Sequence, residues 1–169
     1  FEGAQRRATA MGYRLEEYWL NTPGTSLRRA AEILNARGVQ GLILAPQPDG
    51  VVALDLDCTR FSVVTIGPTL RWPAYHMVSN HQFRTVTSLC EGLVERGYRR
   101  IGYAIERRID DRMGGQWSAA FDRFQRDLPA DRQLMRYEAS PTLAGVRRWL
   151  RETQPDVVVC DGFTGNVIL

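Results

Sequence analysis

Residues 27–45 read LRRAAEILNARGVQGLILA, and this stretch decides the fold class. Its first half places Leu27, Ala30 and Leu34 on one stripe of a helix, because residues three and four apart share a helical face. Gly38 follows directly and can take the left-handed conformation that ends a helix. The remainder is almost continuously apolar, which is typical of a parallel strand covered on both faces. The stretch therefore predicts a helix, a glycine stop and a buried strand.

The same order of elements occurs at two other places in the chain. Residues 1–11 carry an apolar helical stripe, and Gly12 separates them from residues 13–19, which we expect to form a strand. Residues 83–94 repeat the helical pattern before the expected strand 101–105. Further helices are expected at 117–128 and 143–150, and further strands at 62–66, 134–138 and 157–160.

Alternation of helices and strands on this scale predicts an α/β fold with parallel sheets and right-handed crossovers. Ligands of such sheets bind beyond the carboxyl ends of the strands. The loops expected at those ends are therefore the places to search for function. They cover residues 20–25, 45–50, 67–81, 106–112, 139–140 and 161–166.

The composition is that of an ordinary globular protein. Of 169 residues, 44% are apolar and 24% are charged, which suits one large domain or two small lobes, and no apolar run is long enough to cross a bilayer. All 22 basic residues are arginines, scattered as pairs in a chain of net charge +3, so we expect this segment itself not to bind DNA strongly. The chain begins at Phe1 inside an expected helix, and we expect both ends of the natural protein to lie outside it.

The cysteines, Cys58, Cys90 and Cys160, are odd in number and widely spaced. No CxxC pair occurs, so neither a zinc site nor a redox pair is expected. Cys90 and Cys160 sit inside apolar runs, which is typical of small core residues. Unpaired thiols favour a reducing, cytoplasmic setting.

Motifs for catalysis and nucleotide binding are missing from the sequence. No G-x-G-x-x-G or phosphate-binding loop follows a strand, and no G-x-S-x-G elbow occurs. His76 and His81 lack the spacing of a metal site, and Asp110 and Asp111 are neighbours in sequence, whose side chains rarely face each other. We therefore expect no catalytic residue, no metal, no cofactor and no enzyme activity.

Polar and aromatic residues in the expected strand-end loops remain as candidates. Arg112 could make paired hydrogen bonds to vicinal hydroxyls or to a carboxylate, and it could equally form a surface salt bridge with Asp110 or Asp111. Trp72 and Phe163 could each stack on the apolar face of a sugar ring, or simply pack within their loops.

Four stretches of the chain, taken in order, resemble the LacI/GalR family of transcription regulators. Residues 26–46 are similar to the family's helix leading into "R-V-D-G-I-I-L-A-P", and residues 97–103 resemble "G-H-R-R-I-A-Y". Residues 112–119 fit "R-x-x-G-[FY]-x-x-A", with Gln116 where an aromatic is usual, and residues 155–160 resemble "P-D-A-V-F-C". Order and spacing agree across nearly the whole chain.

The resemblance implies two Rossmann-like lobes of the type I periplasmic-binding-protein-like kind, with a ligand between them. The lobes would divide near Gly97, so that residues 1–97 form an N-terminal lobe without its first strand and residues 98–169 form part of a C-terminal lobe. It also implies a homodimer that binds operator DNA through an N-terminal helix-turn-helix not present in this chain. Residues 1–11 and 27–37 resemble the dimerising surface of the family, and their exposed arginines could equally be solvated.

The resemblance further implies a small-molecule effector, usually a sugar, contacted by Arg112. His81 stands where the family has an aspartate. The family's "N-D" corresponds to residues 162 and 163 here, so Phe163 stands at the position of its aspartate. Asp161 lies two positions before that. The expected ligand-binding set is therefore Arg112, His81, Asp161, Trp72 and Phe163. These departures favour an unusual sugar or another small polar molecule.

The expected function is an allosteric switch. An effector that prefers one interlobe angle would change the dimer interface and so the spacing of the DNA-reading heads. Two alternatives stay open. A periplasmic sugar-binding protein of a transporter would share the fold and the ligand site, and a small α/β enzyme would share the fold alone.

Overall fold

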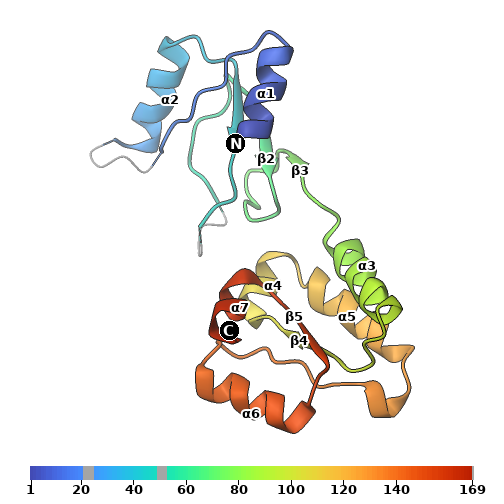
Figure 1. The fold of residues 1–169 in the computed structure, drawn as a ribbon. Coiled ribbons are helices and arrows are strands. Elements are labelled where there is room, and N and C mark those ends of the chain that lie inside the picture. The colour runs from blue at the N-terminus through green and yellow to red at the C-terminus, as the bar shows by residue number, and fades with distance from the viewer. Residues whose placement is uncertain (21–24, 49–52, 169) are drawn as a thin grey trace. The chain divides into compact units, whose positions relative to one another are not determined.

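The computed structural model describes residues 1–20, 25–48 and 53–168 (Figure 1). Its helices are α1 (Glu2–Ala10), α2 (Leu27–Ala36), α3 (Gln82–Glu95), α4 (Arg107–Arg112), α5 (Gln116–Arg126), the 3-10 helix η1 (Ala130–Arg132), α6 (Leu143–Thr153) and α7 (Gly162–Ile168). Its strands are β1 (Gly41–Leu44), β2 (Ser62–Ile66), β3 (His76–Val78), β4 (Ile101–Ala104) and β5 (Val157–Cys160). None of the described helices is both long and apolar enough to span a membrane.

Packing divides the chain into two compact units. The smaller unit comprises Phe1–Leu42 and Leu54–Val63, and the larger unit comprises Ile43–Ala53 and Val64–Leu169. The lobe boundary predicted near Gly97 falls between α3 and β4 and stays a prediction.

Strands β4 and β5 form the buried sheet of the larger unit. They pair in parallel, with Ile101 opposite Val157 and Ala104 opposite Cys160. Side chains alternate between the faces of a strand, so Ile101 and Tyr103 pack with α3 and α5, whereas Ala104 packs with α6. Figure 1 shows α6 and the α3–α5 pair on opposite sides of these strands. The prediction of a parallel sheet covered on both faces is confirmed here.

A glycine in β4 allows α6 to approach the sheet closely. A Cβ atom on Gly102 would lie 2.8 Å from Cη2 of Trp149 and 3.0 Å from Cβ of Pro155. The buried indole of Trp149 donates its N–H to the carbonyl oxygen of Met135 at 2.7 Å. The position therefore requires a residue without a side chain.

Strands β1, β2 and β3 form a second sheet in that order. β2 and β3 are parallel, with Val64 opposite His76 and Ile66 opposite Val78. Ile66 is 44% exposed and Val78 is 65% exposed. The burial on both faces that the apolar runs predict is therefore not found in this sheet among the described residues.

The glycines expected to stop helices do so. Gly12, Gly38 and Gly97 have φ values of 79°, 73° and 93°. These lie in the left-handed region, which side chains with a Cβ rarely adopt. The helix, glycine, strand order is thus confirmed at α2–β1 and at α3–β4.

Thr142 caps the start of α6, and its Oγ1 accepts the backbone N–H of Gly145 at 3.1 Å. Ser140, two residues earlier, donates its hydroxyl to the carboxylate of Glu106 at 2.9 Å. The segment before α6 is therefore tied to the residue that precedes α4.

Two predicted strands do not form. Residues 13–19 do not form a strand. Residues 134–138 contribute only an isolated bridge, between Tyr137 and Ala104. Apolar runs of this length need a pairing partner that the local sequence does not identify.

Candidate functional site

Segments that follow β1, β2 and β4 are joined by hydrogen bonds within the larger unit. The backbone N–H of Gln47 donates to Oγ1 of Thr69 at 2.7 Å. Nη2 of Arg112 donates to the carbonyl oxygen of Gln47 at 2.5 Å. Nη2 of Arg71 donates to the carbonyl oxygen of Asp111 at 3.0 Å. We refer to Gln47, Thr69, Arg71, Asp111 and Arg112 as the strand-end cluster.

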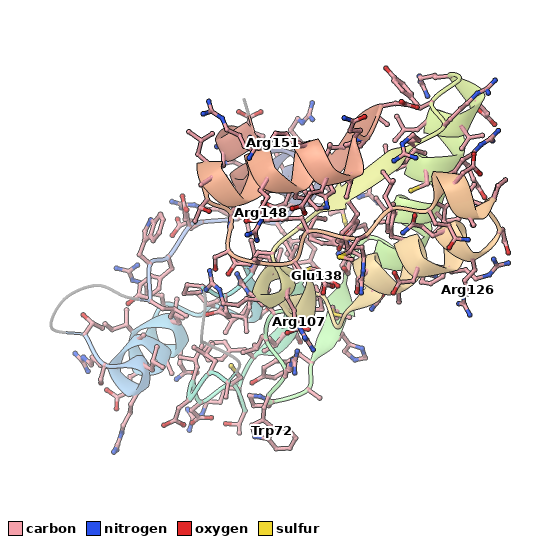
Figure 2. All side chains as sticks on the ribbon, turned by 90° about the horizontal axis from the view of Figure 1, so that it is seen from below. Trp72, Arg107, Arg126, Glu138, Arg148 and Arg151 are labelled. Atoms are coloured by element: carbon pink, nitrogen blue, oxygen red, sulfur yellow. The ribbon has the colours of Figure 1, made fainter. Side chains whose placement is uncertain are left out.

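Helix α4 positions Arg112 in this cluster. The sequence predicts a loop here, but the segment is helical and is fixed at its start. The buried carboxylate of Glu106 accepts from Oγ of Ser140 at 2.9 Å, and the backbone N–H of Arg107 donates to the carbonyl oxygen of Glu138 at 2.9 Å. Figure 2 shows Arg107 and Glu138 beside α4. The guanidinium of Arg112 therefore extends from an anchored helix.

The two neighbouring aspartates of α4 have different partners. Asp110 is 4% exposed, and its carboxylate accepts the backbone N–H groups of Trp117 at 3.1 Å and Ser118 at 3.2 Å. Asp110 thus caps the start of α5. The exposed carboxylate of Asp111 lies 4.0 Å from Nε of Arg107. The carboxylates do not form an acid–base pair, and each is committed to a structural contact.

No protein-family model matches the sequence, and no curated protein matches it in sequence. Solved structures do match its fold. A protein from Burkholderia thailandensis assigned as a ribose operon repressor matches with a TM-score of 0.56, covering 98% of this chain and 63% of that chain at 20% identity. The fold is that of LacI-type regulators.

Two further structures support the LacI-type fold. A PurR family transcriptional regulator from Vibrio parahaemolyticus matches with a TM-score of 0.52, covering 93% of this chain and 62% of that chain at 15% identity. A LacI family transcriptional regulator from Lactobacillus casei, with bound glucose, matches with a TM-score of 0.50, covering 94% and 62% at 17% identity. The chain therefore spans about 60% of the length of the structures it matches. The α/β, periplasmic-binding-protein-like fold predicted from the sequence is confirmed.

Among the predicted site residues of this LacI-type fold, Arg112 lies in the strand-end cluster and Trp72 directly follows another member, Arg71. Trp72 is 69% exposed, and Figure 2 shows its ring projecting outward from its loop. The ring is thus accessible for stacking, and its role in binding stays a prediction.

The other predicted site residues cap helices or lie within them. Nδ1 of His81 accepts the backbone N–H of Arg84 at 3.3 Å at the start of α3. The carboxylate of Asp161 accepts the backbone N–H and the hydroxyl of Thr164, both at 2.9 Å, at the start of α7. Phe163 belongs to α7, which replaces the loop predicted there, and its side chain lies outside the described residues. Ligand roles for these residues stay predictions.

Several polar groups near the strand ends were not predicted. Gln47 joins the cluster through main-chain atoms and Thr69 through its hydroxyl, contacts that leave no pattern in sequence, whereas Arg71 joins through its guanidinium. Gln82 is 6% exposed, and its Oε1 accepts the indole N–H of Trp117 at 2.5 Å, which ties the start of α3 to α5. Arg71 alone had a signal, since it lies beside Trp72 in a loop already selected.

Burial affects two of the thiols. Burial raises the pKa of Cys90 to about 11, and burial also raises the pKa of Cys160, so neither thiol is activated as a nucleophile. Among the residues that the structure describes, no group of three or more His, Cys, Asp and Glu side chains is placed to hold a metal ion.

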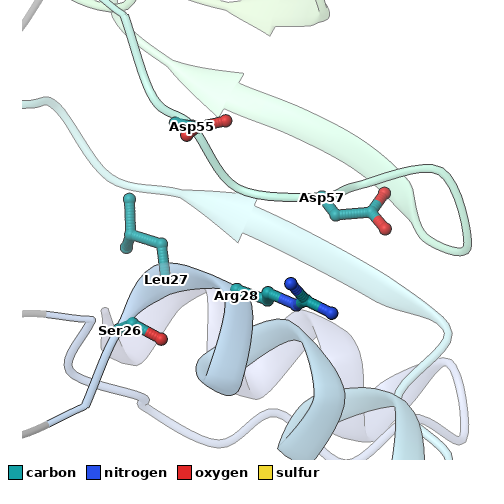
Figure 3. Close-up of a pocket in the computed structure, with 5 residues that line it drawn as sticks. All are labelled: Ser26, Leu27, Arg28, Asp55 and Asp57. Carbon is teal, nitrogen blue, oxygen red and sulfur yellow. The ribbon is translucent and has the colours of Figure 1, made fainter.

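An open hollow of about 640 Å³ lies on the smaller unit (Figure 3). It is lined by Ser26, Leu27, Arg28, Asp55 and Asp57. Figure 3 shows both aspartates across from the first turn of α2. Hydrogen bonds from the hydroxyl and backbone N–H of Thr59 lower the pKa of Asp57. None of the predicted site residues lines this hollow.

Proposed function

We propose that this chain is the effector-sensing part of a LacI-type transcription regulator and binds a small, sugar-like polar molecule at the strand-end cluster. The observation that carries the proposal is the joining of the segments after β1, β2 and β4 by Gln47, Thr69 and Arg112, in a fold shared with regulators. A LacI family regulator of this fold holds glucose.

In this proposal Arg112 gives the effector its main polar contact. Its guanidinium would leave the carbonyl oxygen of Gln47 and donate to the effector. Trp72 would stack on the apolar face of the ring, and His81, Asp161 and Phe163 would complete the site.

Binding would act on DNA by a population shift. The effector would favour one arrangement of two lobes that divide near Gly97, to the extent that it binds that arrangement more tightly. The arrangement would set the spacing of DNA-reading heads, supplied by an N-terminal helix-turn-helix outside this chain, in a cytoplasmic homodimer. Helices α1 and α2 would lie in the dimer interface.

The test is a thermal-shift screen of the purified chain with sugars, sugar acids and nucleobases. A ligand at about 100 times its Kd should stabilise the chain by about 2.7 kcal/mol. Arg112→Ala should abolish the shift, and Arg112→Lys should weaken it because lysine lacks the planar fork of donors.

The matched control is Arg151→Ala, which removes an exposed arginine of α6 (Figure 2) and should leave the shift unchanged. Circular dichroism of each variant confirms that it folds. A shift that persists in a folded Arg112→Ala variant would remove Arg112 from the site, and no shift with any member of the screen would contradict the sensing function.

A further inference from the structure

We propose that Gln82 is a positioning residue of the effector site, because it fixes the start of α3, which follows His81, against the helices that hold Arg112. The inference rests on the proposed function, in which His81 and Arg112 both contact the effector. Gln82 would not touch the effector itself. Its role would be to keep two contacts, which come from separate helices, at the spacing that the effector requires.

Gln82 is a buried polar side chain at the first residue of α3. It is 6% exposed, and its Oε1 accepts the indole N–H of Trp117 at 2.5 Å. Its Nε2 donates to Oδ1 of Asn80 at 2.8 Å, and Nδ2 of Asn80 donates back to Oε1 at 3.2 Å. A buried amide is costly unless it is hydrogen-bonded, so these bonds favour one position of the side chain. The start of α3 is thereby tied to α5 and to the segment before α3.

The start of α5 is tied in turn to α4. The backbone N–H of Trp117 donates to the carboxylate of Asp110 at 3.1 Å, and that of Ser118 donates to the same carboxylate at 3.2 Å. Asp110 lies two residues before Arg112 in the six-residue helix α4. Trp117 therefore engages α4 through its main-chain N–H and α3 through its indole N–H. It joins the helix of Arg112 to the residue that follows His81.

His81 lies at the end of this series of contacts. Its Nδ1 accepts the backbone N–H of Arg84 at 3.3 Å, so a neutral ring carries its proton on Nε2. The side chain is exposed, and the Nε2–H group can donate to an effector oxygen. A hydrogen bond weakens quickly outside its narrow range of length and angle. A shift of the first turn of α3 would therefore weaken the contact between His81 and an effector already held by Arg112.

Gln125 of α5 offers a matched comparison. Its Oε1 accepts the backbone N–H of Leu134 at 2.6 Å, and its Nε2 donates to the carbonyl oxygen of Leu134 at 2.7 Å. These two bonds tie α5 to a segment that carries none of the proposed effector contacts. The two glutamines are alike in chemistry, and only Gln82 belongs to the series that joins Arg112 to His81.

The first experiment follows the indole N–H groups by NMR, since the chain has only four tryptophans. Labelling tryptophan with a nitrogen isotope gives one signal for each indole, and Trp117→Phe identifies the signal of Trp117. Gln82→Met keeps the length of the side chain without its amide, and should speed exchange of the Trp117 indole proton with deuterated water by about tenfold or more. Trp149, whose indole N–H donates to Met135 at 2.7 Å, is the internal control and should not change.

The second experiment is calorimetric titration with glucose, ribose, gluconate and adenine as probes. Gln82→Met should weaken the binding of any probe that the wild type binds by about tenfold, equivalent to about 1.4 kcal/mol. Gln82→Glu keeps an acceptor for Trp117 and Asn80, and should bind within about threefold of the wild type. Gln125→Met loses two bonds of the same kind and should leave the affinity unchanged. Circular dichroism of each variant confirms that it folds.

Trp117→Phe breaks the same series from the other side. It should weaken binding by a factor similar to that of Gln82→Met, because the indole N–H that reaches Gln82 is lost. The positioning role is thus tested even where one of the two variants does not fold.

Each contrary outcome has a separate meaning. Equal weakening in Gln82→Met and Gln125→Met would show a general loosening of the fold and would overturn the positioning role. A probe bound equally well by the wild type and Gln82→Met, or an unaltered exchange of the Trp117 indole in that variant, would also overturn it and leave the sensing function standing. Binding of no probe at millimolar concentration would overturn the proposed function, and this inference with it.

Discussion

The β4–β5 sheet and the β1–β2–β3 sheet differ in burial, although apolar runs predicted β1 and β2 as well as β4 and β5. Strand β3 lies in a segment that was expected to be a loop. All residues of β4 are buried, and α5 buries Ala120 and Phe121 against it. All residues of β3 are exposed, and α1 buries none of its side chains among the described residues. The burial of a strand therefore depends on which helices pack on it and does not follow from an apolar run alone.

The largest contrast should come from truncating side chains. Phe121 is fully buried, with its ring 5.0 Å from that of Tyr103 and 6.3 Å from that of Phe124, centroid to centroid. Phe121→Ala should cost about 3–5 kcal/mol because it leaves a cavity. Val78→Ala on β3 should change stability by less than about 0.5 kcal/mol. Urea unfolding measures both, and similar costs would show that the two sheets are equally buried.

Added side chains at strand glycines should give the next largest difference. Gly102→Ala would force its Cβ against Trp149 at 2.8 Å, so we expect a loss of about 1–3 kcal/mol. Gly41→Ala in β1 places its Cβ at an ordinary 3.5 Å from the carbonyl oxygen of Ser62, and stability should change little. Melting temperatures compare the two, and an unchanged value for Gly102→Ala would mean that α6 can move away from β4.

Helix caps should show a smaller contrast. Asp110→Ala removes the acceptor for Trp117 N and Ser118 N and should cost about 1–2 kcal/mol. Ser26→Ala removes a single bond of 3.2 Å from Arg29 N at the start of α2, and should cost about 0.5–1 kcal/mol. Thermal unfolding ranks them, and the reverse order would contradict the account of Asp110 as the cap of α5.

The smallest expected effect is on folding stability at acidic pH. Hydrogen bonds from the backbone N–H groups of Arg99 and Arg100, both at 2.9 Å, hold the pKa of Asp156 below its ordinary 3.8. The carboxyl of Asp156 therefore binds a proton more readily in the unfolded chain than in the folded one. The contribution of Asp156 to stability is complete above pH 3.8 and is lost as pH falls through the lowered pKa of the folded state. Asp156→Asn should therefore flatten the loss of stability in acid.

Asp57 serves as the control for this effect. Its pKa is also lowered, but by Thr59, only two residues away, a contact that can persist locally in the unfolded chain. Asp57→Asn should change the acid response less than Asp156→Asn. Stability measured from neutral pH to below 3.8 decides between them, and equal responses would show that the long-range bond of Asp156 is unimportant.

Much of the fold was readable from the sequence because local chemistry sets it. The strands 62–66 and 157–160 were predicted with the bounds the structure gives, and Gly38 and Gly97 end their helices as expected. The predicted strand 134–138 failed because pairing depends on a partner distant in the chain.

Less of the site was readable. Arg112 was a candidate because it follows the expected strand 101–105, and the structure places it in the strand-end cluster. Gln47 joins that cluster through its main-chain atoms. Because any residue type could supply these atoms, the contact could not be predicted from the residue type at position 47. His81 and Asp161 were candidates through the family resemblance, and the structure shows that each caps a helix.

The most direct test of the central claim is hydrogen exchange measured by mass spectrometry, with and without the ligand found in the screen. If the strand-end cluster binds it, protection should rise in peptides covering residues 45–48, 67–75 and 106–112. Protection confined to the hollow lined by Arg28, Asp55 and Asp57, or to neither place, would contradict the claim.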